Sequence, residues 1–382
     1  MPGPFSQSVI AVVWDFDKTL IAGSMQTPLF ARYGVDERAF WDEVDALGDF
    51  YLAHGAHRVN EDALYLNHVL EYVRSGTFRG LTNAVLRELG AELTFHPGMP
   101  EFLARLRSSV EDDPAFERAD ISLEHYVVST GLRPMIEGSA IRPLVDDVWA
   151  CEFVEAHHPP GFAQPEQGQL FPSREITALA YQIDNTSKTR ALFEINKGTN
   201  KRPEIHVNSA LAPELRRVPF EHMIYVADGP SDVPAWSVVR ANGGRAFGVY
   251  QHGSLAQFEQ ISQLQRDGRI HAFAEADYRP DSTAFLWLHS EVRRIAEGMV
   301  EDRELAMRRA VRSAPRHVSD EPATTTTDAP MAKPQPAPGA SVRPMPARSR
   351  ADEIRDAVRR SLSDEPVPVA DPRPESERVP GQ

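Results

Sequence analysis

Three short apolar segments that lie far apart in the sequence each end in a cluster of acidic or hydroxyl residues. The segments are Val9–Trp14, His125–Val128 and His222–Ala227, and the clusters after them are Asp15 with Asp17, Ser129-Thr130-Gly131, and Asp228 with Asp232. If the segments are neighbouring parallel strands, their carboxyl ends line one crevice, which is where open α/β sheets bind ligands. We therefore expect the three clusters to converge. One acidic pair at a strand end is common in turns, so the inference rests on the whole set.

Stretches with helical spacing separate these apolar segments. They are Met99–Leu106, Ser187–Asn196, Val233–Arg240 and Ser254–Arg266, and one further apolar run is Arg245–Tyr250. Strands that alternate with helices are typical of a parallel sheet covered on both faces. The sequence therefore predicts an α/β fold, a doubly wound (Rossmann-like) parallel sheet.

A long insertion separates the first two predicted strands. Residues 22–94 are rich in helix formers and contain aromatic residues such as Phe40, Trp41 and Tyr65. The segment is too long to be a plain crossover connection. We predict that residues 22–94 form a helical cap inserted after the first strand, and that residues 1–21 and 95–312 form the core domain.

The C-terminal residues 313–382 have a different composition. They hold 13 of the 31 prolines and no Phe, Trp or Tyr, so they offer little apolar surface to offset the entropy of ordering. We predict a disordered C-terminal tail. Ile354, Val358 and Leu362 recur at a spacing of four, which predicts a short helix over 350–362. Two interpretations stay open: this helix docks on a protein partner, or it forms transiently without a function.

Charge and cysteine content narrow the class of protein. The formal net charge is −14 over 382 residues, and a nucleic-acid surface should instead show a basic patch. Cys151 is the only cysteine, so an internal disulfide is impossible. No apolar run reaches about 18 residues, and no secretory signal is visible at the N-terminus. We expect a cytoplasmic protein that binds neither nucleic acid nor a membrane.

The ordered set of clusters resembles the motifs of the haloacid dehalogenase-like (HAD) superfamily. Asp15-Phe16-Asp17-Lys18-Thr19-Leu20 is similar to the first motif, Ser129 to the second, and Asp228-Gly229-Pro230-Ser231-Asp232 to the fourth. The resemblance spans about residues 9–250. It implies that Asp15 is the nucleophile, which forms an aspartyl-phosphate, and that Asp17 is the general acid and base.

The resemblance also implies a metal site and a phosphate site. Mg²⁺ would be held by the Asp15 carboxylate, the backbone carbonyl of Asp17, and Asp228, with Asp232 in support. The substrate phosphate would be bound by Ser129-Thr130-Gly131 and by the lysine of the third motif.

Two lysines compete for that third motif. Lys188 and Lys197 lie nine residues apart on one helical pattern, so at about 100° per residue they face opposite ways. The helix should begin near residues 185–187, at the level of the crevice, which places Lys197 about 13 Å further away. We choose Lys188; the alternative is that it is an ordinary surface lysine.

The second aspartate narrows the activity. In the family that the chain resembles, dehalogenases lack this carboxylate and ATPase pumps carry a threonine there, so Asp17 indicates a phosphatase or a phosphomutase. Trp149-Ala150-Cys151-Glu152-Phe153 resembles the phosphoserine-phosphatase-like branch, whose acidic residue for the substrate amino group is replaced here by Ser24. Arg133 is either a contact for a substrate anion or a surface residue.

We expect a Mg²⁺-dependent phosphatase for a small phosphorylated metabolite. The alternatives are a phosphomutase or phosphotransferase, and an inactive interaction protein that uses its tail.

Overall fold

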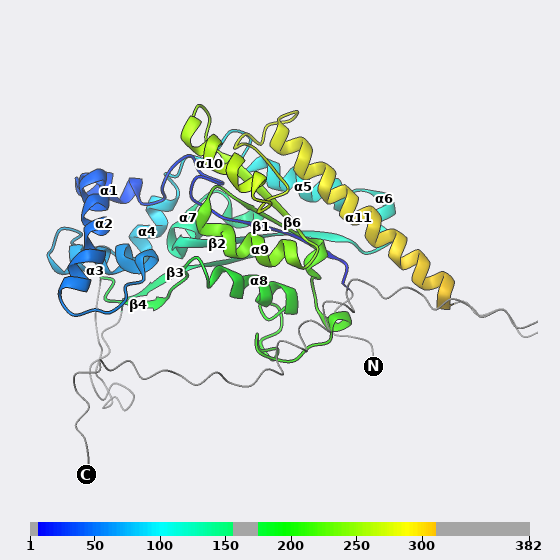
Figure 1. Ribbon diagram of the computed structural model, residues 1–382, viewed down its shortest axis with the longest axis horizontal. Coiled ribbons are helices and arrows are strands. Elements are labelled where there is room, and N and C mark those ends of the chain that lie inside the picture. Colours follow the sequence, from blue (N-terminus) through cyan, green and yellow to red (C-terminus); the bar gives the residue numbers. More distant parts are fainter. Residues whose placement is uncertain (1–6, 156–174, 311–382) are drawn as a thin grey trace, which may run out of the picture. The chain divides into compact units, whose positions relative to one another are not determined.

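The computed structural model describes residues 7–155 and 175–310, and within them a seven-stranded sheet has the order β4-β3-β2-β1-β5-β6-β7 (Figure 1). The strands are β1 (Val9–Trp14), β2 (Ser122–Leu132), β3 (Asp147–Val154), β4 (Ala178–Tyr181), β5 (Met223–Ala227), β6 (Arg245–Tyr250) and β7 (Ala272–Glu275). The predicted parallel sheet is confirmed for every pairing except one. The edge strand β4 runs antiparallel to β3, so the sheet is mostly, rather than wholly, parallel.

The strand β1 lies at the centre of the sheet. All six of its residues are apolar and buried, as expected for a strand covered on both faces. It pairs in parallel with β2 on one side and with β5 on the other. The chain runs outward from β1 through β2 and β3, then returns to β5, so the direction of winding reverses beside β1. Ligands bind at such a switch point, at the carboxyl ends of the strands.

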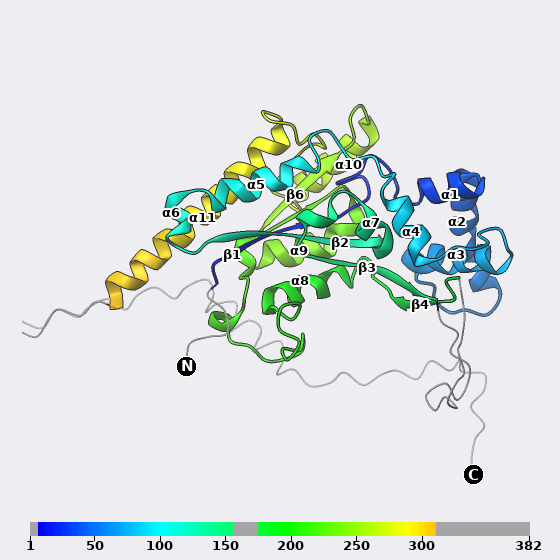
Figure 2. The same ribbon diagram turned by 180° about the vertical axis from the view of Figure 1, so that it is seen from behind.

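The helices either cover the sheet or belong to an insertion beside it (Figure 1). They are α1 (Thr27–Tyr33), α2 (Glu37–Ala53), α3 (Leu64–Arg74), α4 (Asn83–Gly90), α5 (Glu101–Glu111), α6 (Pro114–Glu117), α7 (Arg133–Gly138), α8 (Lys188–Lys197), α9 (Val233–Ala241), α10 (Leu255–Arg266) and α11 (Thr283–Ala310). α5 packs against α11, and α8 packs against α9 (Figures 1 and 2). The connections from β1 to β2 and from β5 to β6 run in opposite directions across the sheet, so right-handed crossovers put α5 and α9 on opposite faces. Each lies beside its partner helix, α11 or α8. Among the residues that the structure describes, no helix is long and apolar enough to cross a membrane.

The first four α-helices after β1, α1 to α4, form one segment, residues 27–90, which we call the helical insertion. It lies within the predicted segment 22–94 and has an aromatic interior. The Phe30 and Phe40 rings lie 4.7 Å apart, and Phe78 packs against Tyr72 at 5.0 Å. Ring pairs at these separations stabilise a small helical unit beyond the area they bury.

The second strand is longer than predicted at both ends, since β2 begins at Ser122 rather than His125, and β5 begins one residue later than predicted, at Met223. The second strand was expected to end at Val128, but β2 continues to Leu132, so Ser129-Thr130-Gly131 belongs to the strand. Its register with β3 shifts between Val128 and Leu132. The extended backbone therefore continues past the point where regular pairing breaks. The predicted tail 313–382 and its helix over 350–362 lie outside the described residues.

Candidate active site

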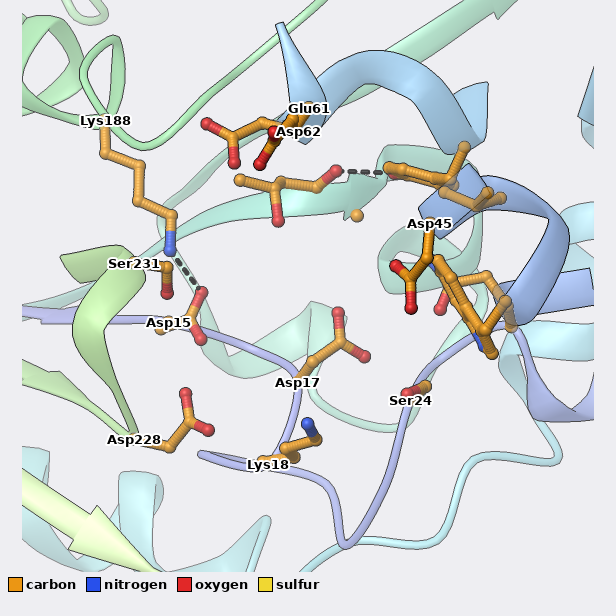
Figure 3. Close-up of a pocket in the computed structure, with 16 residues that line it drawn as sticks. Asp15, Asp17, Lys18, Ser24, Asp45, Glu61, Asp62, Lys188, Asp228 and Ser231 are labelled. Atoms are coloured by element: carbon orange, nitrogen blue, oxygen red, sulfur yellow. Dashed lines mark hydrogen bonds and ion pairs between the residues drawn. The ribbon is translucent and has the colours of Figure 1, made fainter. Parts of the chain in front are cut away.

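A cavity of about 340 Å³ opens at the carboxyl ends of β1, β2 and β5 (Figure 3). Its lining combines residues of the strands and α8 with residues of the helical insertion. From the core come Asp15, Asp17, Lys18, Ser24, Gln26, Thr130, Gly131, Lys188, Asp228 and Ser231, and from the insertion come Trp41, Val44, Asp45, Glu61, Asp62 and Tyr65. Segments separated by more than 200 residues in sequence thus share one cavity, as the strand-end clusters led us to expect.

Lys188 is the buried cation of the site. It is the first residue of α8, its side chain is 1% exposed, and its Nζ donates to Asp15 Oδ1 at 2.9 Å and to Asp232 Oδ1 at 2.7 Å. Burial alone would lower the pKa of Lys188, but the two carboxylates raise it above its ordinary value. The competing Lys197 donates to the Val207 and Ser209 carbonyl oxygens instead. Of the two lysines, the structure therefore brings Lys188 to the cluster.

Asp232 accepts a hydrogen bond from Lys188 and is itself held by two further hydrogen bonds. Its Oδ1 also accepts a hydrogen bond from the Tyr225 hydroxyl at 2.6 Å, and its Oδ2 accepts one from Ser231 Oγ at 2.8 Å. Asp232 is fully buried and does not line the cavity. Sequence reasoning missed Tyr225, although a tyrosine inside the apolar strand Met223–Ala227 needs a partner for its hydroxyl once it is buried.

Asp17 points into the cavity from the turn after β1. Its Oδ1 accepts from the backbone N–H of Met25 at 2.5 Å. A methyl group on Gly131 would lie 2.1 Å from the Met25 methyl carbon and 3.2 Å from Asp17 Oδ2, so a side chain here would require the end of the Met25 side chain to move. Burial, followed by repulsion from Asp15, raises the pKa of Asp17 to about 7. A carboxyl group that titrates near neutral pH suits both donation and acceptance of a proton.

Asp15 and Asp228, the other strand-end aspartates that line the cavity, also have raised pKa values. Burial raises the pKa of Asp15 to about 6, against the opposing effect of the Lys188 ammonium. Burial, with repulsion from Asp15 and Asp232, raises the pKa of Asp228 to about 8. Crowded carboxylates of this kind gain most from a cation placed between them.

The donor set fits a hard divalent cation. One carboxylate oxygen each of Asp15, Asp228 and Asp232 lies within 4.8 Å of the others. Oxygen-only ligands beside a cavity that can admit water are the kind that Mg²⁺ takes. Since Lys188, Tyr225 and Ser231 occupy the Asp232 oxygens, Asp15 and Asp228 are the carboxylates better able to bind such an ion.

Only two of the three residues Ser129-Thr130-Gly131 line the cavity. Thr130 and Gly131 line the cavity, whereas Ser129 does not, and Ser129 is 1% exposed. Ser129 Oγ accepts a hydrogen bond from the Gly131 N–H at 2.9 Å. The hydroxyl proton of Ser129 is therefore left to donate elsewhere. Its predicted contact with a phosphoryl oxygen stays a prediction.

Ser24 and Arg133, which the sequence analysis also singled out, differ in whether they line the cavity. Ser24 lines the cavity, in agreement with its position after the first motif. Arg133 does not line it, because its guanidinium pairs with Glu137 at 2.9 Å and with Glu152 at 3.1 Å. Of the two interpretations of Arg133, the geometry favours a residue of the outer surface.

Comparison with known proteins gives one relative in sequence and several similar folds. No protein-family model matches the chain. It is 35% identical over 289 residues to an uncharacterized protein of Borreliella burgdorferi, which covers 75% of this chain and 97% of that protein. A HAD-family hydrolase of Salmonella enterica serovar Typhi is similar in structure, with a TM-score of 0.43 and 13% identity over 75% of this chain and 72% of the other. A phosphoserine phosphatase in its apo form gives a TM-score of 0.38 and 12% identity over 71% of this chain and 96% of that one. With identities this low and TM-scores below 0.5, these structures carry no argument about the role of this chain.

Proposed function

The chain belongs to the same family as the uncharacterized Borreliella burgdorferi protein, and we propose that it is a HAD-like phosphatase. In this proposal the enzyme depends on Mg²⁺ and hydrolyses a small-molecule phosphomonoester through an aspartyl-phosphate on Asp15. The observation that most supports it is the buried Lys188 between Asp15 and Asp232, with the cavity in front of them. A cation buried against a strand-end carboxylate suits a site for a phosphate dianion.

The proposed reaction has two steps with opposite proton transfers. In the first, an Asp15 oxygen attacks phosphorus, the bond from phosphorus to the leaving oxygen breaks, and Asp17 gives its proton to that oxygen. In the second, Asp17 takes a proton from water, the water oxygen attacks phosphorus, and the bond from Asp15 to phosphorus breaks. Inorganic phosphate leaves and both carboxyl groups return to their starting states.

The remaining side chains would bind and orient the phosphoryl group. Lys188 would hold a phosphoryl oxygen and keep Asp15 in place, while Thr130 and Gly131 would line the other side of the phosphate. Mg²⁺ held by Asp15, the Asp17 carbonyl and Asp228 would supply neutralisation of negative charge. Asp232 would support that site through Lys188.

The size and the walls of the cavity support a small substrate. About 340 Å³ lies within the usual range for small-molecule sites, and Trp41 and Tyr65 of the helical insertion form part of its wall. A small phosphorylated metabolite fits this space better than a macromolecule does. Transfer of the phosphoryl group to an alcohol would use the same residues, so phosphotransfer remains the second candidate.

The test is to trap the intermediate on Asp15. We expect wild-type protein with Mg²⁺ to release phosphate from an aryl phosphate, and Asp15→Asn to release none. Mass spectrometry of acid-quenched protein should find one phosphoryl group on the peptide that contains Asp15.

A second comparison uses the two lysines. Lys188→Ala should lose activity, and its matched control Lys197→Ala should keep it. Full turnover in EDTA would contradict the metal assignment, and phenol release that rises with added alcohol while free phosphate falls would favour phosphotransfer.

A further inference from the structure

The helical insertion contacts both halves of the proposed active site through two side chains that are three residues apart. Asp62 lies in the short helical turn η1 (Glu61–Ala63), and Tyr65 lies in the first turn of α3. Residues three apart in a helix lie on the same face. Both side chains line the cavity, and each hydrogen-bonds to a different segment of the core.

Asp62 accepts two hydrogen bonds from Asn185, in the turn that precedes α8. Its Oδ1 accepts from Asn185 Nδ2 at 2.8 Å, and its Oδ2 accepts from the Asn185 backbone N–H at 3.1 Å. Asp184 and Ser187 close the same turn, since each side chain accepts from the other's backbone N–H, at 2.6 and 2.7 Å. Lys188 follows directly. The position of the lysine that binds Asp15 is thereby linked to the helical insertion.

Tyr65 orients the peptide that follows Thr130. Its hydroxyl donates to the Thr130 carbonyl oxygen at 2.5 Å, and Cys151 Sγ lies 3.3 Å from the same oxygen. In a trans peptide the carbonyl and the next N–H point in opposite directions. Fixing the Thr130 carbonyl therefore fixes the Gly131 N–H, which donates to Ser129 Oγ. The hydroxyl of Ser129 is oriented in turn.

We propose that Asp62 and Tyr65 are positioning residues, which set the Lys188 turn and the Thr130–Gly131 peptide for phosphoryl transfer when the insertion is seated on the core. The inference rests on the proposed phosphatase function. Neither side chain exchanges a bond or a proton with the substrate; each acts through Asn185 or Thr130. Catalysis by positioning is sensitive, because displacement of a catalytic group by about 1 Å can cost about a hundredfold in rate.

The experiment compares Tyr65→Phe and Asp62→Ala with the wild-type protein. Tyr65→Phe removes one hydroxyl and keeps the ring, and Asp62→Ala removes both acceptors. For an aryl phosphate, with active sites counted from the burst of phenol, we expect kcat to fall at least about fivefold and KM to change by less than about twofold. Hydrogen exchange should become faster at residues 129–132 in Tyr65→Phe and at residues 184–188 in Asp62→Ala.

Matched controls come from the same helical insertion. Tyr72→Phe removes a hydroxyl from α3 that donates only to Glu43 of the insertion, at 2.8 Å, and Asp42→Ala removes an exposed carboxylate paired with Arg38. Both should keep wild-type kcat and exchange rates. Wild-type kcat in Tyr65→Phe and Asp62→Ala would overturn the inference, whatever the exchange rates are. If the wild-type protein hydrolyses no phosphate ester, the proposed function fails by itself. Faster exchange in the two variants would then support the seating contacts, and unchanged exchange would overturn them.

Discussion

At the scale of single residues, Asp15 and Asp17 share one turn but have different partners. Asp15 Oδ1 accepts from the Lys188 ammonium, whereas Asp17 Oδ1 accepts from the neutral N–H of Met25. A cation favours the charged form of Asp15, which the role of nucleophile needs. Without an ion-pair partner in the part of the chain that the structure describes, Asp17 can hold a proton near neutral pH. The two carboxyl groups are therefore suited to different tasks.

Asp17→Asn should separate the two chemical steps. An alkyl phosphate needs protonation of its leaving oxygen, so formation of the intermediate should slow by about 10²–10⁴, the usual effect of losing a general acid. An aryl phosphate with an acidic phenol needs little such help, so its first step should slow less. Hydrolysis of the intermediate would still lack its base, so stopped-flow measurements should show a burst of phenol while phosphoenzyme accumulates. Equal losses on alkyl and aryl substrates without a burst would rule out this division of roles.

Sequence patterns predicted the charged members of the site better than their supports. Asp15, Lys188 and Asp228 stand at strand or helix ends, where a parallel sheet must bring them together. Tyr225 and Tyr65 could not be assigned, because each acts on a partner that only the folded chain brings near. Ser129 shows the same limit: its place at the end of an apolar run was visible, but its hydrogen bond to Gly131 depends on the local path of β2.

At the scale of secondary-structure elements, the helical insertion is joined to the core by an unusually close helix contact. Gly90 ends α4 and Gly138 ends α7. A methyl group on Gly90 would lie 2.1 Å from the Met135 carbonyl oxygen, and one on Gly138 would lie 1.9 Å from the Arg87 carbonyl oxygen. The obstacles are backbone atoms, which cannot move aside as a flexible side chain can. The two helix ends approach this closely only because both residues lack a side chain.

Gly90→Ala should therefore destabilise the protein, by about 1–3 kcal/mol if the helices separate to relieve the overlap. Gly48 in the interior of α2 is the matched control, since no atom beyond its chain neighbours and the backbone of its own helix lies within 4 Å of a methyl group placed there. Gly48→Ala should stabilise the protein by about 0.5–1 kcal/mol, because alanine loses less backbone entropy in a helix. Urea unfolding curves measure both changes. Equal effects of the two substitutions would show that the close approach has no energetic consequence.

The predicted bounds match the structure best for two strands that turn residues enclose. β1 is wholly buried, β6 has four buried residues between two half-buried ends, and both have the predicted bounds. The strands β3, β4 and β7 were not predicted. β4 and β7 are edge strands of four residues, which carry too little pattern to distinguish a strand from a loop. Pairing with a neighbour decides such segments, and pairing is not visible in one sequence.

At the scale of the whole molecule, one buried imidazole joins three elements of the core. The His125 ring from β2 is fully buried. Its Nδ1 accepts from Trp14 Nε1 of β1 at 3.2 Å, and its Nε2 lies 3.0 Å from the Leu103 carbonyl oxygen of α5. The indole N–H can only donate, so Nδ1 must be unprotonated and Nε2 must carry the hydrogen. A second proton on Nδ1 would face the Trp14 N–H with no acceptor.

This arrangement predicts that the folded protein loses stability in acid over a defined range. Burial lowers the pKa of His125 to about 3, while the unfolded chain has the ordinary value of about 6.5. Between pH 6.5 and 3, His125 is protonated in the unfolded state but not in the folded state, so the free energy of unfolding falls as the pH is lowered. The slope from this one group approaches about 1.4 kcal/mol per pH unit within that range. Burial also lowers the pKa of His222, to about 4, so the wild-type slope includes other histidines.

His125→Gln isolates the contribution of this group. At pH 8 the imidazole is neutral in both states, so the difference between variant and wild type there measures only packing and hydrogen bonding. Between pH 6 and 4.5 the variant should lose stability less steeply, by close to one proton, because glutamine does not titrate. Urea unfolding at half-unit steps of pH gives both curves, and the His125 ring resonances in NMR should stay constant until the pH falls below about 4. Parallel curves for the two proteins, or a resonance that titrates near pH 6.5, would mean that His125 accepts a proton inside the folded core.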